Sequence, residues 1–219
     1  MRVAIAGAGN VGRAIARELL ENGHQVLLID KDPKALKMDS VPNAEWLLAD
    51  ACEITALDQA KLDGCQVLVA ATGDDKVNLV ASLLAKTEYG VPRVVARINH
   101  PKNEWLFDSS WGVDVAVSTP RIISALVEEA VSVGDVVRLF SFRKGQANLV
   151  ELTLPDTSMC IGKTVEEITL PDDASLAAIV RDGRVITPTP TDVFSAGDEL
   201  LFVASATAES LIKSCFIEQ

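Results

Sequence analysis

The sequence predicts an α/β protein in which a doubly wound parallel sheet is followed by a smaller C-terminal mixed α+β domain. Short β-branched runs alternate with helical patterns in the first half, and strand-like segments dominate after Gly134. The aromatic share is only 5%, so the core must rest on Val, Ile, Leu and Ala. Such a core is typical of parallel strands that helices cover on both faces.

Six strands are expected in the first half. Each is a short apolar run bounded by turn residues or by a helical pattern. Their ranges are Val3–Ala6, Gln25–Asp30, Glu45–Ala49, Gln66–Ala71, Arg93–Ile98 and Asp114–Val117. Right-handed crossovers between parallel strands then place the connecting helices on the two faces of the sheet.

Helical periodicity is clear between several of these strands, for example at Val11–Glu21 and Lys76–Thr87. A further helix is expected to begin at Thr119-Pro120, because Thr can cap free N–H groups and Pro is tolerated at the first helical position. It should run to about Val133, where Gly134 ends it.

The second half is expected to hold five strands and two short helices. The strand ranges are Val136–Phe142, Leu149–Leu154, Leu176–Arg181, Arg184–Ile186 and Glu199–Val203. Asp182-Gly183 predicts a two-residue hairpin turn, and the helices are expected near Thr164–Ile168 and Thr207–Lys213. So small a core favours stabilisation by self-association.

The chain therefore divides into three expected segments. Residues 1–118 form the parallel α/β domain, residues 119–134 form a connecting helix, and residues 135–219 form the C-terminal domain.

Composition excludes several classes of partner. A net charge of −11, with no cluster of basic residues, disfavours binding to nucleic acid and to anionic lipid. The longest apolar runs are far shorter than the roughly 18 to 20 residues of a membrane-spanning helix. No export signal is recognisable, and the four scattered cysteines form no metal-binding pattern, so a cytoplasmic protein with reduced cysteines is expected.

A glycine loop joins the first strand to the first helix. In Gly7-Ala8-Gly9-Asn10-Val11-Gly12, the first Gly permits the tight turn and the second lets the backbone approach a pyrophosphate. Gly12 lets helix and strand pack closely, and the helix N-terminus presents free N–H groups to the phosphates. The loop predicts a Rossmann-like dinucleotide site.

Asp30 ends the second strand, 18 residues after Gly12, where a carboxylate can accept hydrogen bonds from ribose hydroxyls. The alternative is that Asp30 only caps the loop Lys31-Asp32-Pro33. Asp30 also argues against a 2′-phosphate on the ribose, although the adjacent Lys31 weakens that exclusion.

Three more strand ends face the same crevice: Asp50-Ala51, Thr72-Gly73-Asp74 and Arg97. Asp50 can bond the adenine amino group or a ribose hydroxyl, and Thr72-Gly73 can line the ribose-phosphate side. Arg97 can meet a phosphate or a carboxylate of a partner. For each group, a loop cap or a surface ion pair is the alternative.

Catalytic groups are few. His24 lies away from the carboxyl edge, and His100 follows the fifth strand, where it is either a general base or an exposed loop residue. Nothing in the spacing of the carboxylates or Lys163 singles one out. A nucleotide sensor is therefore favoured over an enzyme, with a small NAD-dependent dehydrogenase as the alternative.

Several short motifs then carry a family resemblance. In the first half they are the glycine loop, Ile29-Asp30-Lys31-Asp32, Ala49-Asp50-Ala51, Ala71-Thr72-Gly73-Asp74-Asp75 with Asn78, and Ala96-Arg97-Ile98-Asn99. In the second half they are Ile161–Val165, Ala178–Gly183, Ile186–Pro190 and Ala196–Leu200. The order and spacing of these motifs over the whole chain resemble those of the Trk/Ktr-type potassium transport regulatory proteins, whose unit is the RCK or KTN domain.

The resemblance implies a cytoplasmic homo-oligomer, a dimer, a tetramer or an octameric ring, docked on an integral membrane potassium transporter or channel that it gates without catalysis. It implies NAD(H) or ATP/ADP as the nucleotide, and in some relatives a second ligand such as cyclic di-AMP in the C-terminal half. Some relatives carry a basic residue where Asn10 stands, so NAD(H) is favoured here, unless Arg13 compensates. The helix after Pro120 is implied to cross over a neighbouring subunit, with packing on its own sheet as the alternative. A soluble partner in place of the transporter is a third hypothesis.

Overall fold

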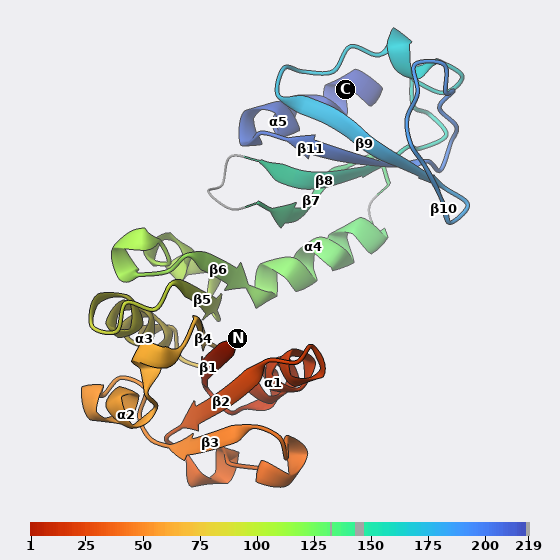
Figure 1. Ribbon diagram of the computed structural model, residues 1–219. Helices are drawn as coiled ribbons and strands as arrows, with labels where there is room; N and C mark the ends of the chain where they lie inside the picture. Colours follow the sequence, from red (N-terminus) through yellow and green to blue (C-terminus); the bar gives the residue numbers. More distant parts are fainter. Residues whose placement is uncertain (132, 143–146, 218–219) are drawn as a thin grey trace. The chain divides into compact units, whose positions relative to one another are not determined.

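The computed structural model describes residues 1–131, 133–142 and 147–217. These form two compact units, Met1–Pro120 and Arg121–Gln219 (Figure 1). The first unit is a parallel α/β unit, and the second is built on an antiparallel sheet.

The first unit contains one six-stranded sheet in the order β3-β2-β1-β4-β5-β6, with every neighbouring pair parallel. The strands are β1 (Arg2–Ala6), β2 (Gln25–Asp30), β3 (Glu45–Leu48), β4 (Val67–Ala70), β5 (Arg93–Ile98) and β6 (Val115–Ser118). The helices are α1 (Asn10–Glu21), α2 (Ile54–Gln59) and α3 (Asp75–Thr87). Short 3-10 helices lie at Pro33–Ala35, Met38–Ser40, Leu62–Gly64, Pro101–Leu106 and Ser109–Trp111. The expected doubly wound sheet is confirmed, and no strand end differs from the expected one by more than one residue.

Both faces of this sheet are buried. In β1, Ala4 and Ala6 pack on one face with Leu27, Leu57 and Leu68, whereas Val3 and Ile5 pack on the other. Strands buried on both faces read as continuous apolar runs, which explains why the sequence showed them so clearly.

The strand order reverses direction between β1 and β4, because β2 and β3 lie on one side of β1 while β4 to β6 lie on the other. In open parallel sheets the crevice for ligands lies at the carboxyl ends of the strands at this switch point. The topology therefore opens a crevice between the loop after β1 and the loop after β4.

α4 (Thr119–Val131) begins at the expected Thr119. The expected end near Val133 is not reached within the described residues: Ser132 lies outside them, and Val133 is not helical. Ile122, Ile123, Leu126 and Val127 are exposed by 39% to 57%. The side chains of Ala130 and Val131, expected on the same apolar face, lie outside the described ones.

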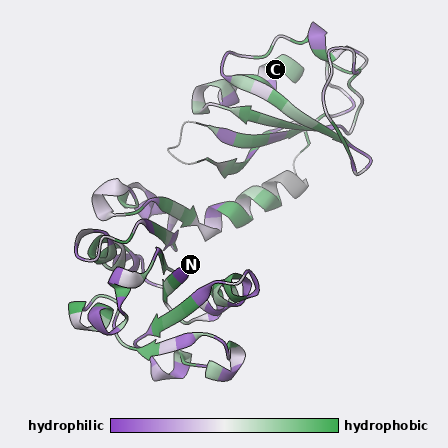
Figure 2. Ribbon diagram, in the orientation of Figure 1, coloured by the Kyte–Doolittle hydropathy of each residue, from purple (hydrophilic) through white to green (hydrophobic). Residues whose placement is uncertain are grey.

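The second unit holds a five-stranded antiparallel sheet in the order β10-β9-β11-β8-β7. The strands are β7 (Val136–Ser141), β8 (Asn148–Thr153), β9 (Ala174–Arg181), β10 (Arg184–Ile186) and β11 (Glu199–Ala204). The helices are α5 (Ala206–Phe216) and a short 3-10 helix at Val165–Glu167. The strands of both sheets are largely hydrophobic (Figure 2). Asp182 and Gly183 both have positive φ, 51° and 73°, as the expected hairpin turn requires.

Phe194, Phe202 and Phe216 form the centre of the second core. Phe216 lies edge-on to Phe194 and to Phe202, with ring centroids 5.6 and 5.5 Å apart. Because Phe216 is fully buried, α5 extends three residues beyond the expected end at Lys213.

Candidate functional site

The glycine loop has the geometry that its three glycines predict. Gly7 has φ of 107°, and a Cβ atom there would lie 2.9 Å from the Ala71 carbonyl carbon at the end of β4. A Cβ atom at Gly12 would lie 1.9 Å from the carbonyl oxygen of Gly7, so helix α1 and the loop are in direct backbone contact. At Gly9, by contrast, a Cβ atom would meet nothing within 4 Å. The backbone at Gly9 therefore faces open space.

A cavity of about 600 Å³ lies beside this loop at the carboxyl edge of the sheet. Its volume is within the range of small-molecule sites. Its lining residues are Gly7, Gly9, Asn10, Val11, Ile29, Asp30, Lys31, Ala49, Asp50, Ala51, Ala71, Thr72, Gly73, Asp74, Val77 and Arg97. The structure thus brings together all the predicted site residues except Ala8 and Gly12, which are buried behind the loop.

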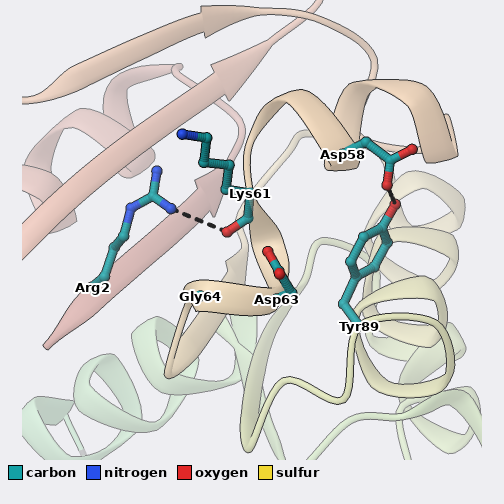
Figure 3. A pocket seen from close by; sticks show the side chains of 6 residues that line it. All are labelled: Arg2, Asp58, Lys61, Asp63, Gly64 and Tyr89. Carbon is teal, nitrogen blue, oxygen red and sulfur yellow. Dashed lines mark hydrogen bonds between the residues drawn. The ribbon is translucent and has the colours of Figure 1, made fainter.

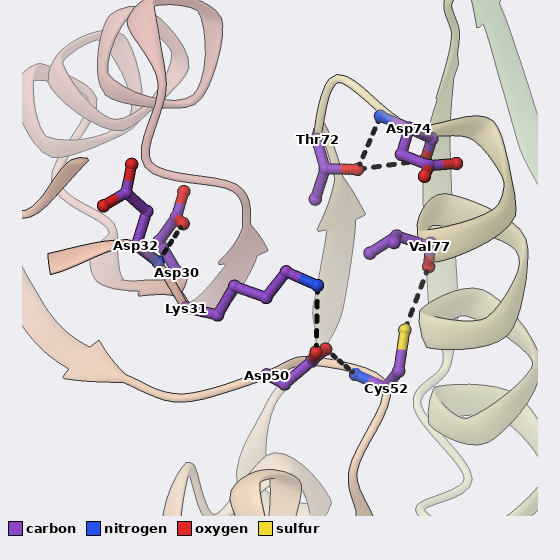
Figure 4. Close-up of polar contacts among 8 residues, drawn as sticks. All are labelled: Asp30, Lys31, Asp32, Asp50, Cys52, Thr72, Asp74 and Val77. Atoms are coloured by element: carbon purple, nitrogen blue, oxygen red, sulfur yellow. Dashed lines mark hydrogen bonds and ion pairs between the residues drawn. The ribbon is translucent and has the colours of Figure 1, made fainter. Parts of the chain in front are cut away.

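Asp30 stands at the rim of the cavity and holds the glycine loop. Its Oδ2 accepts a hydrogen bond from the Ala8 N–H at 2.7 Å, and its Oδ1 accepts one from the Asp32 N–H at 2.9 Å. The second bond is the loop cap that was expected as the alternative to a ribose contact (Figure 4). A carboxylate offers about four lone-pair sites, so these two bonds leave acceptor capacity for a ligand.

Lys31 and Asp50 form an ion pair across the cavity mouth, with 3.2 Å between Nζ and Oδ2 (Figure 4). The Cys52 N–H, which donates to Asp50 Oδ1 at 3.0 Å, lowers the pKa of Asp50 below its usual range; partial burial opposes the shift and Lys31 adds to it. Burial, assisted by the Asp50 charge, raises the pKa of the Cys52 thiol to about 11. At neutral pH Cys52 is therefore a protonated thiol beside an exposed ion pair.

Asn78 of α3, which is fully buried, ties the loop after β4 to the end of β5. Its Oδ1 accepts from the Thr72 N–H at 2.9 Å, and its Nδ2 donates to the Arg97 carbonyl at 2.9 Å. Asp74 caps α3 by accepting from the Lys76 N–H at 2.8 Å. Thr72 and Arg97 are thus held in place by one side chain, and Asp74 has the cap role that sequence reasoning left open.

Arg97 lines the cavity and has one unsatisfied donor. Its Nε atom is buried and, within the described part of the chain, has no hydrogen-bond partner. A buried donor without an acceptor is costly, and an anion in the cavity is the kind of group that would satisfy it.

Asp75, the first residue of α3, was named only as part of a motif and was given no role. Its carboxylate is 7% exposed and accepts from the Asn99 and His100 N–H groups, and from the Asn99 and Asn103 side-chain amides, at 2.6 to 3.0 Å. Burial raises the pKa of Asp75, but these donors together outweigh it and hold the pKa below the usual range. Asp75 therefore fixes the chain just after β5, next to Arg97.

His100 does not line the cavity. Its side chain is exposed, and its Nδ1 accepts from the Lys102 N–H at 3.2 Å, which caps the 3-10 helix Pro101–Leu106. Of the two expected roles, the structure places His100 in that of an exposed loop residue.

Four apolar lining residues were also missed: Ile29, Ala49, Ala71 and Val77. Ile29, Ala49 and Ala71 belong to the quoted motifs but were given no role there. Val77 was read only as part of the apolar face of a helix.

A second cavity, of about 650 Å³, is lined by Arg2, Asp58, Lys61, Asp63, Gly64 and Tyr89. Arg2 donates to the Lys61 carbonyl at 3.1 Å, and the Tyr89 hydroxyl lies 2.8 Å from Asp58 Oδ1 (Figure 3). It lies beside the start of β1, so it is remote from the carboxyl edge, and its lining mixes both signs of charge. It has no feature of the glycine-loop site.

Over the described ranges, no helix has the length and hydrophobicity needed to cross a bilayer. Among those same residues no group of His, Cys, Asp and Glu could hold a metal ion.

A six-stranded parallel sheet, a glycine loop in backbone contact with its helix and an acidic residue at the end of β2 define a protein of the Rossmann-like, nucleotide-binding class. The chain matches the family model described as the TrkA-N domain over residues 3–119, and that of the TrkA-C domain over residues 149–214. The chain belongs to the TrkA family, which confirms the resemblance read from its motifs.

Among its relatives, the Trk system potassium uptake protein TrkA of Mycobacterium tuberculosis is 58% identical over 95% of both chains. A TrkA homolog of Methanothermobacter thermautotrophicus is 29% identical, again over 95% of both. A solved structure of the GsuK RCK domain has a TM-score of 0.66 at 16% identity, and the GsuK channel bound to NAD has 0.68 at 17%. The two alignments cover 99% and 100% of the present chain, which corresponds to 48% and 40% of the two GsuK chains. They show that the fold is shared.

Proposed function

We propose that this protein is a regulatory subunit of a potassium uptake system and that it senses an adenine nucleotide, NAD(H) first, in the glycine-loop cavity. The observation that carries the proposal is the pairing of Asp30 at the cavity rim with a loop backbone that is open at Gly9. The family membership supports the transport role, and the NAD named in the GsuK channel structure supports the ligand.

The residues present fit a dinucleotide. The open backbone at Gly9, at the N-terminus of α1, suits a pyrophosphate, and the free Nε of Arg97 suits a second anionic group. Asp30 and Asp50 lie where the adenosine would bind, and a carboxylate there disfavours the 2′-phosphate of NADP(H). Asn10 supplies no charge for a terminal phosphate, which ranks ATP/ADP below NAD(H).

Binding would regulate rather than catalyse. A ligand shifts a conformational equilibrium by the difference in its affinity for the two states, and this is the role proposed for the nucleotide. In the alternative, a small NAD-dependent dehydrogenase, His100 or a crevice carboxylate would transfer the proton. His100 does not line the cavity, and the carboxylates that do line it accept hydrogen bonds from backbone N–H groups. The membrane partner is proposed to be a separate potassium transporter or channel, approached from the cytoplasm.

Replacing Asp30 by Ala should weaken NADH binding by about tenfold or more, because a hydroxyl-to-carboxylate hydrogen bond is worth roughly 1.5 to 3 kcal/mol. Calorimetric titration measures this directly. Asp32→Ala is the matched control. Asp32 is an exposed carboxylate two residues away, and it accepts a hydrogen bond from the Lys34 N–H. Equal affinity of the Asp30 variant and the wild type would remove the ribose assignment. The same titration with NAD⁺, ATP, ADP and cyclic di-AMP ranks the ligands.

The exposed apolar face of α4 supports the proposal of a homo-oligomer. Ile122, Ile123, Leu126 and Val127 lie within two turns of one helix, and exposed patches of this kind mark protein contacts. We expect light scattering of the full chain to give the mass of a dimer or a larger ring. Replacing Leu126 and Val127 by Ser should lower that mass, whereas a monomeric wild type would contradict the assignment.

A further inference from the structure

Arg13 of α1 is a buried cation beneath the glycine loop. It is only 8% exposed. Its Nη1 donates to the Ala8 carbonyl at 2.5 Å and, more weakly, to the Ala35 carbonyl at 3.4 Å, and its Nη2 donates to Asn10 Oδ1 at 2.7 Å. All three acceptors among the described residues are uncharged, so no carboxylate neutralises the guanidinium there.

The contact with Arg13 fixes which end of the Asn10 amide faces the guanidinium. A guanidinium carries five N–H donors and no acceptor, so the Asn10 atom that faces it must be the carbonyl oxygen. The amide nitrogen Nδ2 then points to the other side. Asn10 is exposed and lines the cavity, and its Nδ2 has no acceptor within the described part of the chain.

Arg13 and Asp30 together hold the Ala8 segment of the loop. Asp30 accepts from the N–H of Ala8, while Arg13 donates to its carbonyl oxygen. The two peptide groups that flank Ala8 are therefore both held by side chains, and the Arg13 guanidinium lies within hydrogen-bond distance of the loop backbone.

We propose that Arg13 is a positioning residue for the diphosphate of a bound nucleotide: it holds Asn10 so that Nδ2 donates to a phosphate oxygen. The proposal rests on the nucleotide function proposed above and assigns the phosphate side of that site. The buried charge of Arg13 adds an attraction for the diphosphate that solvent screens only weakly. Adenosine, which has no phosphate, does not use this side of the cavity.

The test is Asn10→Asp, titrated with adenosine, ADP and NADH by calorimetry. The variant keeps an oxygen for Arg13 and so preserves the loop, but it offers the diphosphate a carboxylate in place of an N–H donor. We expect the affinity for ADP and NADH to fall by about tenfold or more, and that for adenosine to stay within about twofold. Because the new carboxylate also repels a diphosphate, Asn10→Ala, which removes the donor without adding a charge, is titrated beside it. A loss of ADP and NADH affinity in both variants supports the Nδ2 bond, whereas a loss in Asn10→Asp alone overturns it.

Arg13→Met removes the donors and the charge while keeping the length of the side chain, and it should give the same split between phosphate-bearing ligands and adenosine. Arg17→Met is the matched control, since Arg17 is exposed on the same helix one turn further on and is absent from the cavity lining. Asn10 is exposed, so Asn10→Asp remains informative if Arg13→Met does not fold.

Three outcomes overturn the inference alone: unchanged ADP and NADH affinity in Asn10→Asp, a loss in Asn10→Asp that Asn10→Ala does not share, or an equal loss for adenosine, ADP and NADH. If the wild-type chain binds neither adenosine, ADP nor NADH, the proposed nucleotide function is overturned as well. Failure of the Arg13 proposal and failure of the nucleotide function can therefore be told apart.

Discussion

Gly12→Ala should lower the free energy of unfolding by about 3 kcal/mol or more and weaken NADH binding by about tenfold or more. The added Cβ atom would lie 1.9 Å from the carbonyl oxygen of Gly7, and both are parts of rigid backbone, so α1 and the loop must move apart. Urea denaturation followed by circular dichroism measures the stability, and calorimetry the affinity.

Gly9→Ala is the matched control in the same loop. Gly9 has a φ of −67°, which any residue adopts, and its Cβ would meet no protein atom within 4 Å. The free energy of unfolding of Gly9→Ala should therefore stay within about 0.5 kcal/mol of the wild-type value. Because that Cβ would enter the cavity, NADH affinity should still fall. If Gly12→Ala proved as stable as Gly9→Ala, the close contact between α1 and the loop would be wrong.

Asp198→Ala should destabilise the protein by about 3 kcal/mol. Asp198 is fully buried, receives Arg181 at 2.6 and 2.7 Å through Nε and Nη2, and accepts from the Ser195 N–H at 2.8 Å. The substitution leaves the Ser195 N–H and the guanidinium without their acceptor, although Arg181 is partly exposed and can reach water. The loss of stability is therefore expected at the low end of the range for breaking a buried ion pair.

Glu199→Ala is the control for Asp198, since Glu199 is the next residue and is exposed. It should change the unfolding free energy by no more than about 0.5 kcal/mol in urea titrations. Equal stability of the two variants would mean that the Arg181–Asp198 pair contributes nothing. The pair also gives a physical role to the Asp of the Ala196–Leu200 motif, which sequence reasoning could only describe as a resemblance.

Much of the first unit was predictable because its strands are apolar on both faces and its glycines report backbone contacts. Most of the glycine loop lines one cavity together with Asp30, as its spacing after β1 led us to expect, because that spacing follows from the strand-turn-helix geometry. The side-chain contacts of Asp75 and Arg13 were not predictable, because their partners include Asn99, Asn103 and Ala35, which are distant in sequence.

The second unit was predicted less completely. β9 begins at Ala174, two residues before the expected start, and α5 ends at Phe216, beyond the expected Lys213. Both differences follow from tertiary packing, since Ala174 pairs with Ala204 of β11 and Phe216 fills the aromatic core. Local periodicity carries no information on such contacts.

Asn78 has a further consequence for how the cavity can move. Because this one amide is bonded to Thr72 on one wall and to the backbone of Arg97 on the other, the two walls are mechanically coupled. A displacement of the Thr72 loop that keeps both bonds must carry the end of β5 with it. We therefore expect the β4 and β5 sides of the cavity to shift together rather than separately when a ligand binds.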